Sequence, residues 1–236
     1  MKNFIPEIFE SSIIVVGKFN PAIFSPDWLT GNNLIGSEDA KSALQNPSFM
    51  ITTQMSRFET EWFVLQVLNQ QFSLSSKGPI SPAIKDLAVH IFSLLPHTPV
   101  TALGLNFMAH YKIQTVKDYY KIGDVLAPKT IWDGINFFNE QSTGLESLTI
   151  RVDPFKRKEN SLDHQNKDVK RVIVQPSGRV PQGVFFTFND HHDIEHFGDL
   201  SFTKAEHVSN IINKKWDDTW VEAKGVFGKV LQNALK

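Results

Sequence analysis

The sequence predicts an α+β fold with a largely antiparallel sheet, packed helices and a long C-terminal helix. Apolar and polar residues alternate without a break over residues 100–113, which is typical of a half-buried strand. Apolar residues recur at helical spacing from residue 208 to residue 234. Expected strands arrive in adjacent groups, each followed by a helix, and this order favours antiparallel pairing over a βαβ arrangement.

The length of 236 residues suits a single domain. The order of the expected elements suggests two related halves, residues 1–125 and 126–236, although no repeat of individual residues accompanies it. No apolar run approaches the roughly 18 residues of a membrane span, and the N-terminus lacks the apolar core of a signal peptide. We therefore expect no membrane association and a cytoplasmic location.

The N-terminal third predicts a mixture of strands and short connections. Residues 13–16 form a β-branched run that is typical of a buried strand. Two prolines within residues 19–29 argue against a regular helix there, and the large apolar side chains predict a packed connection. Ser37 is expected to cap a short helix that ends at Leu44.

Residues 49–74 predict a strand, a turn and a long second strand. That second strand is expected to carry one apolar face made of Val64, Leu68, Phe72 and Leu74. Ser81 and Pro82 then begin an amphipathic helix, because proline is favoured at the first helical position. In the strand over residues 100–113, the side chains expected to face the core are Leu103, Leu105, Phe107 and Tyr111.

The second part of the chain predicts three more strands, at residues 148–152, 170–174 and 184–188. A short helix is expected between Thr115 and Gly123. Residues 153–168 are almost wholly polar and predict an exposed, mobile loop.

The C-terminal region predicts one long helix, or two helices broken near Lys214. Thr203 and Glu206 have the spacing of a capping box. One apolar stripe follows, comprising Val208, Ile212, Trp216, Trp220, Ala223, Phe227, Val230 and Ala234.

The densest group of potential metal ligands and proton carriers follows the strand at residues 184–188. His192, Glu195 and His196 fit the H-x-x-E-H pattern of one zinc-peptidase class, and His191 adds a further imidazole. If the segment were helical, His191, His192 and His196 would be candidate ligands for zinc or another divalent metal, and Glu195 a candidate general base. The competing interpretation is a polar loop at the end of a strand, because Gly198 leaves any helix only about two turns.

Other polar residues are weaker candidates. Asn106 and His110 share the polar face of the strand over residues 100–113, and His90 lies in the preceding helix. The basic residues 156–158 are interleaved with acidic ones, and the net charge is −1, so nucleic acid is not an expected partner.

Several kinds of chemistry lack their signatures. The chain has no cysteine, no glycine-rich phosphate loop and no Gly-x-Ser-x-Gly nucleophile elbow. Trp216 and Trp220 on the C-terminal helix are candidate interaction residues, because tryptophan is favoured at interfaces as well as in cores.

The strand sequence Val100-Thr101-Ala102-Leu103-Gly104-Leu105-Asn106-Phe107, and the layout of strand, helix and strand around it, resemble a sporadically distributed family of uncharacterised bacterial proteins. The family has no established activity to carry over. The resemblance implies a bacterial accessory protein encoded beside defence or mobile-element genes.

Two functions follow from these patterns. The first is a non-catalytic interaction or assembly subunit, without a cofactor, that binds another protein or a second copy of itself. The alternative is a metal-dependent hydrolase that uses His191, His192, Glu195 and His196.

Overall fold

The fold is built on one nine-stranded sheet, in a computed structural model that describes residues 4–78, 82–135, 143–153, 168–195 and 203–236. All neighbouring strands are antiparallel, in the order β2-β3-β4-β5-β1-β6-β9-β8-β7. The strands are β1 (Ile8–Gly17), β2 (Met50–Ile51), β3 (Met55–Glu59), β4 (Phe63–Leu68), β5 (Gln71–Ser76), β6 (Val100–Lys112), β7 (Leu148–Val152), β8 (Val169–Pro176) and β9 (Gly183–Asp193). The α+β class with antiparallel sheet is confirmed.

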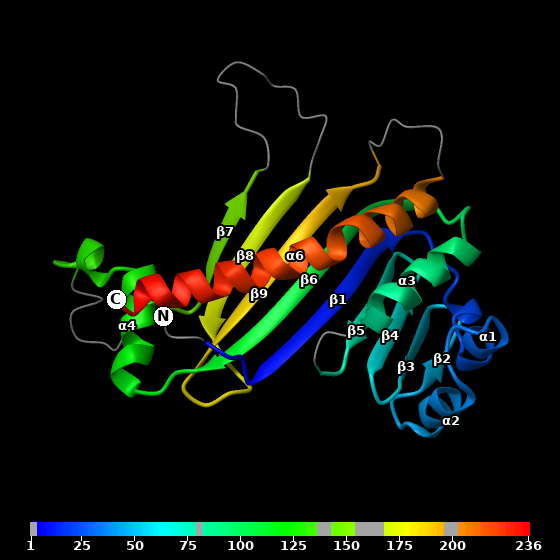
Figure 1. Cartoon of the computed structure of the whole chain (residues 1–236), viewed down its shortest axis with the longest axis horizontal. Coiled ribbons are helices and arrows are strands. Elements are labelled where there is room, and N and C mark those ends of the chain that lie inside the picture. The colour runs from blue at the N-terminus through cyan, green and yellow to red at the C-terminus, as the bar shows by residue number, and fades with distance from the viewer. Residues whose placement is uncertain (1–3, 79–81, 136–142, 154–167, 196–202) are drawn as a thin grey trace, which may run out of the picture.

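The described helices are η1 (Pro21–Ile23), α1 (Pro26–Gly31), α2 (Ser37–Gln45), α3 (Pro82–Leu94), α4 (Val116–Leu126), η2 (Lys129–Trp132) and α6 (Lys204–Ala234). Helices α3 and α6 pack on one face of this sheet, and α4 packs against α6 beyond the ends of the strands (Figure 1). Figure 1 shows α6 and α3 lying across the near face of the strands, with α1 and α2 beside β2 and β3 at one end. None of the helices within the described ranges is long and apolar enough to cross a membrane.

The two sides of the sheet repeat one order of elements. The chain runs β1, short helices, β2 to β5 and α3, and then β6, α4, β7 to β9 and α6. The central strands β1 and β6 pair with each other, so each half extends outward from the middle of the sheet. This repeat divides between Leu94 and Val100, whereas the sequence pattern suggested a division after residue 125.

The strand over residues 100–113 and the C-terminal helix are the predictions that the structure confirms most fully. Leu103, Leu105 and Phe107 are 0% exposed and Tyr111 is 4% exposed, so β6 buries the expected face. Helix α6 is continuous over 31 residues, and Thr203 and Glu206 form the expected capping box. Because Val208, Ile212 and Phe227 are 0% exposed, the stripe faces the core.

Two expectations in the first half are wrong. Residues 26–31 do form a helix, because Pro26 occupies its first position, where no backbone N–H is needed, and Ser25 caps it. The supposed long strand is the hairpin β4–β5 with a turn at Asn69 and Gln70. The turn changes the alternation, so Phe72 and Leu74 are buried, whereas Val64 and Leu68, which alternate with buried β4 residues, are only half-buried.

Three helix and strand ends also differ from prediction. Gly36 and not Ser37 is the N-cap of α2, and α4 continues past Gly123 to Leu126. Strand β9 continues to Asp193 and therefore contains the first half of the histidine cluster. Its register with β6 explains the extra length, because the pairing runs on from Phe107–Phe188 to Ala102–Asp193.

Candidate functional site

The histidine cluster lies at the end of β9 and is not helical. His191 and His192 are consecutive strand residues, so their side chains point to opposite faces of the sheet. Glu195 follows the strand on the exposed surface, and His196 lies outside the described residues. Within those residues, no group of three or more histidine, aspartate and glutamate side chains is arranged to hold a metal ion.

His192 instead takes part in a buried ion cluster beneath α6. Its Nδ1 lies 3.3 Å from Asp168 Oδ2, and its Nε2 lies 3.3 Å from Asp190 Oδ2. The second contact has ion-pair distance but lacks hydrogen-bond geometry. Thr219 of α6 donates to the same Asp190 oxygen at 3.0 Å, so the cluster joins the helix to the sheet.

The charges of this cluster support one another. Burial lowers the pKa of His192, but the hydrogen bond to Asp168 and the negative charges of Asp168 and Asp190 outweigh burial and raise it overall. Burial raises the pKa of both carboxyls, but their interactions with His192 hold each pKa below its ordinary value. Lys215 adds a favourable charge near Asp168, and Lys170 does the same near Asp190.

This cluster attaches α6 to the sheet, and two of its three charged side chains are buried. The His192 side chain is 3% exposed and that of Asp190 is 5% exposed, so neither can reach a molecule in solution. Asp168 was expected to belong to a solvated loop, but its carboxylate accepts a backbone hydrogen bond from Asp193 and contacts His192. The rest of that loop, residues 154–167, lies outside the described residues.

The other polar candidates do not converge into a catalytic group. His110 Nδ1 lies 2.7 Å from Ser177 Oγ, and its ring stacks on Phe185. Burial, followed by the charge of Arg179, lowers the pKa of His110. Asn106 accepts a hydrogen bond from Asn189 at 2.8 Å. His90 is bonded through Nδ1 to the carbonyl of Asp86 within α3, far along the fold from these residues.

The two tryptophans of α6 have different environments. Trp216 is 1% exposed and its ring centroid lies 4.9 Å from that of Phe107, so it is a core residue. Trp220 is half-buried between Phe9 and Phe107, with centroid distances of 4.0 and 5.7 Å. Of the two, only Trp220 can contact a ligand or a partner while the helix keeps its place.

The outer strand β7 carries apolar side chains that are exposed on the same face as the core. Phe188, Val172 and Ile150 form one row across β9, β8 and β7, and their exposed fractions are 2%, 8% and 48%. Val152 of β7 is 47% exposed on the same side of the sheet. Helix α6 contacts β6 and β9, and in Figure 1 it crosses only the lower ends of β8 and β7, so that none of the described helices lies in front of the upper part of β7.

Strand β7 also has a free edge. In the part of the chain that the structure describes, β7 pairs only with β8 and no strand occupies its outer side. We use the name β7 surface for this edge together with Leu148, Ile150 and Val152. Free edges that carry apolar side chains are templates for pairing with another chain, since proteins normally protect them with charges, prolines or bulges. The only charged residue within β7, Arg151, points to the opposite face and pairs with Asp153 at 2.9 Å.

The sequence identified β7 as a strand but not as an uncovered one. Its alternation of apolar and polar residues is the same as that of a strand whose apolar face is buried. The contrast with the covered strands appears only when the sheet order and the path of α6 are known.

No protein-family model matches this chain, and no curated protein is similar to it in sequence.

Proposed function

We propose that this chain is a non-catalytic assembly subunit that joins another protein molecule through the β7 surface. The observation that carries the proposal is the exposure of Ile150 and Val152 beside a strand edge that no described residue pairs with. On the basis of the sequence resemblance, we further propose that the subunit belongs to a bacterial accessory system and acts in the cytoplasm. The hydrolase alternative loses support, because His191 and His192 diverge from the same strand.

The occupant that fits the β7 surface best is a second copy of the chain. In an antiparallel pair of β7 strands centred on Ile150, Leu148 faces Val152 and Arg151 faces Thr149 of the other copy. Apolar side chains then meet apolar ones, and no two like charges stand opposite each other. The pairing also satisfies the backbone groups of both free edges, as in other complexes formed by strand addition.

The expected dimer is weak. A strand of five residues supplies a small contact, since a standard interface uses roughly 20–30 residues on each side. We therefore expect a dissociation constant in the micromolar range, which corresponds to about 8 kcal/mol of binding free energy at the standard state.

The test is the mass of the chain in solution as its concentration is varied, measured by sedimentation equilibrium or light scattering. The unaltered chain should approach the dimer mass at concentrations above about 100 μM, and Ile150→Lys should remain a monomer because it places a charge at the centre of the pair. Val221→Lys is the matched control, since Val221 is an exposed apolar residue of α6 at 63% exposure.

The outcomes separate cleanly. A dimer that is lost in Ile150→Lys and kept in Val221→Lys, with both variants melting cooperatively, supports the proposal. A monomer at every concentration, or a dimer that Ile150→Lys leaves intact, would overturn self-association through β7.

A further inference from the structure

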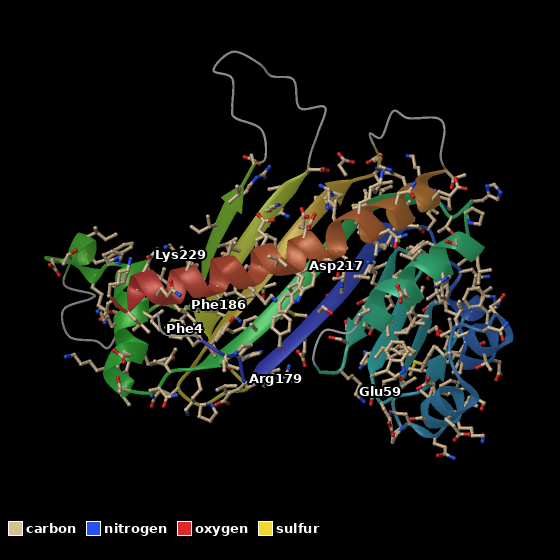
Figure 2. All side chains as sticks on the ribbon, viewed as in Figure 1. Phe4, Glu59, Arg179, Phe186, Asp217 and Lys229 are labelled. Carbon is tan, nitrogen blue, oxygen red and sulfur yellow. The ribbon has the colours of Figure 1, made fainter. Side chains whose placement is uncertain are left out.

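A groove lies on the other flank of α6, away from the β7 surface. It has a volume of about 520 Å³ and runs between the N-terminal segment and the C-terminal half of the helix. Figure 2 shows Phe4 and Lys229 beside this half of α6. A volume of this size is within the range of about 300–1,000 Å³ that is common for small-molecule sites.

The walls of the groove are apolar and aromatic. Phe4, Ile5 and Pro6 line it from the N-terminal segment, and Phe9 and Trp220 line it from β1 and α6. The rings of Phe9 and Trp220 are 4.0 Å apart between centroids, which fixes the wall between strand and helix. Ile5 is 78% exposed, so a ligand with an apolar body would cover surface that is now in water.

The charged groups of the groove are all positive. Lys224 Nζ lies 4.2 Å from the centroid of the Trp220 ring, and Lys229 follows about 1.4 turns later on α6. None of the residues that line the groove is acidic. No carboxylate of the described residues forms an ion pair with either lysine.

Tyr111 supplies a hydroxyl at the same place. Its side chain borders the groove although the residue is only 4% exposed, and within the described ranges its hydroxyl makes no hydrogen bond. Burial raises its pKa to about 12, so the phenol stays protonated and can donate. His192 Nε2 is the sole fully buried side-chain polar atom of the described residues that lacks a partner, so the unbonded Tyr111 hydroxyl is accessible from the groove, and an anionic acceptor there can take its hydrogen bond.

Two glycines keep the floor of the groove open. A Cβ added at Gly225 or Gly228 would meet no atom within 4 Å, so these positions border free space. Both lie inside α6, where glycine costs about 1 kcal/mol relative to alanine. A larger side chain at Gly228 would occupy the groove without disturbing the core.

From these observations we propose that the groove binds a small amphipathic carboxylate, a molecule with one carboxylate and an unbranched or aromatic apolar body. Lys224 and Lys229 attract the carboxylate, and Tyr111 donates a hydrogen bond to it. The apolar body lies against Phe4, Phe9 and Trp220. This site is separate from the β7 surface and does not depend on self-association.

The experiment is calorimetric titration of the full chain with decanoate below its micelle concentration. Decylamine and decanol are the companion probes, with the same apolar body and a positive or an uncharged head. Decanoate should bind at least tenfold more tightly than either, because only a carboxylate meets both the lysines and the tyrosine hydroxyl.

Three variants locate the binding. Lys224→Gln/Lys229→Gln should weaken decanoate binding about tenfold, which is about 1.4 kcal/mol. Gly228→Leu should abolish it by filling the groove, and Tyr111→Phe should weaken it several-fold. Lys117→Gln/Lys214→Gln is the matched control, because it removes the same charge from exposed lysines outside the groove and should leave binding unchanged.

Two results would overturn the proposal. One is no binding of decanoate, or binding no tighter than that of decylamine. The other is equal binding by the unaltered chain, the Lys224→Gln/Lys229→Gln variant and the Gly228→Leu variant, with all three folded by circular dichroism.

Discussion

The outer strands of the two halves differ sharply in burial although they hold equivalent places in the sheet. Counted outward from the centre, β3 and β7 are each the fourth strand of their half. The row Leu74, Leu65 and Phe58 across β5, β4 and β3 is 0% exposed throughout. In the corresponding row of the second half, exposure rises to 48% at Ile150.

The difference comes from the chain that covers each half. In the first half, η1 and α2 contact β3, and Ser56 donates a hydrogen bond to the carbonyl of Phe24 just after η1. Strand β2 protects the edge beyond β3. In the second half, α4 packs near α6, and no strand in the described ranges lies beyond β7. The same order of elements therefore yields a closed core on one side and a partly exposed apolar strand on the other.

The largest expected effect tests this difference directly. Phe58→Ala should lower the free energy of unfolding by about 3–5 kcal/mol, because it leaves a cavity in a closed core. Ile150→Ala should lower it by about 1 kcal/mol or less in the monomer, because half of that side chain is already in water. Urea unfolding at a concentration that keeps the chain monomeric measures both. Equal losses of unfolding free energy in the two variants would show that Ile150 is as buried as Phe58 in solution.

A smaller effect is expected at the ion cluster, which attaches α6 to the second half. His192→Gln should lower the free energy of unfolding by about 3 kcal/mol, since it leaves the buried Asp190 and the partly exposed Asp168 without their cation. His191→Gln is the matched control on the opposite face of β9, and should cost about 1 kcal/mol or less. Comparable losses in the two variants would contradict the role of the cluster.

The difference in unfolding free energy between the unaltered chain and His192→Gln should also depend on pH. The pKa of folded His192 is raised above its ordinary value of 6.5, so its stabilisation is complete below pH 6.5 and is lost as the pH rises through the raised pKa. The gap in unfolding free energy between the unaltered chain and His192→Gln should therefore narrow above pH 6.5.

Other ionisable groups affect the total stability in different directions. His110 and His191 have lowered pKa values and so favour the folded state at higher pH. Asp168 and Asp190 stabilise the fold above about their ordinary pKa of 3.8 and lose that contribution as the pH falls through their lowered values. Both aspartates are ionised above pH 6.5, so over that range the difference in unfolding free energy between the unaltered chain and His192→Gln follows the titration of His192. If this difference in unfolding free energy grew as the pH rose above 6.5, the pKa of His192 would not be raised in the folded protein.

The smallest effect is expected at the ion pair between Lys170 of β8 and Glu222 of α6. Both side chains are partly exposed, at 30% and 44%, and pairs of this kind contribute about 0–1 kcal/mol. Glu222→Gln should therefore leave the free energy of unfolding within about 0.5 kcal/mol of the unaltered chain. Urea unfolding measures this free energy. A loss of roughly 2 kcal/mol or more would be typical of a buried ion pair, and would mean that this pair also attaches the helix to the outer strands.

Much of the fold could be predicted because its signals are local. The alternation in β6 and the helical spacing of α6 each fix which side chains face the core, and the capping box fixes where α6 begins. The hairpin at Asn69 and Gln70 was missed, since a two-residue turn without glycine leaves the apolar content of the segment unchanged. The helix at Pro26 is hard to predict because proline interrupts a helix at most positions but is favoured at its first position, which Pro26 occupies.

The candidate sites were harder to predict because their residues come from distant parts of the chain. The sequence pointed to His192 through its neighbours in the chain. In the structure its hydrogen-bond partner is Asp168, 24 residues away, and its other neighbour Asp190 accepts a hydrogen bond from Thr219. The groove depends on Phe9, Tyr111 and Trp220, which come from three distant segments, and of these the sequence pointed only to Trp220 as a candidate interaction residue.

The sequence by itself determined the α+β class, the buried face of the central strand and the continuous stripe of the C-terminal helix. These follow from periodicity, which acts between residues a few positions apart. Only the tertiary structure decided that no described strand pairs with the outer edge of β7, that His191 and His192 separate to opposite faces, and that lysines and a tyrosine meet in one groove. These depend on strand order and on the path of α6, because exposure and charge pairing are set by which distant segments come to lie side by side.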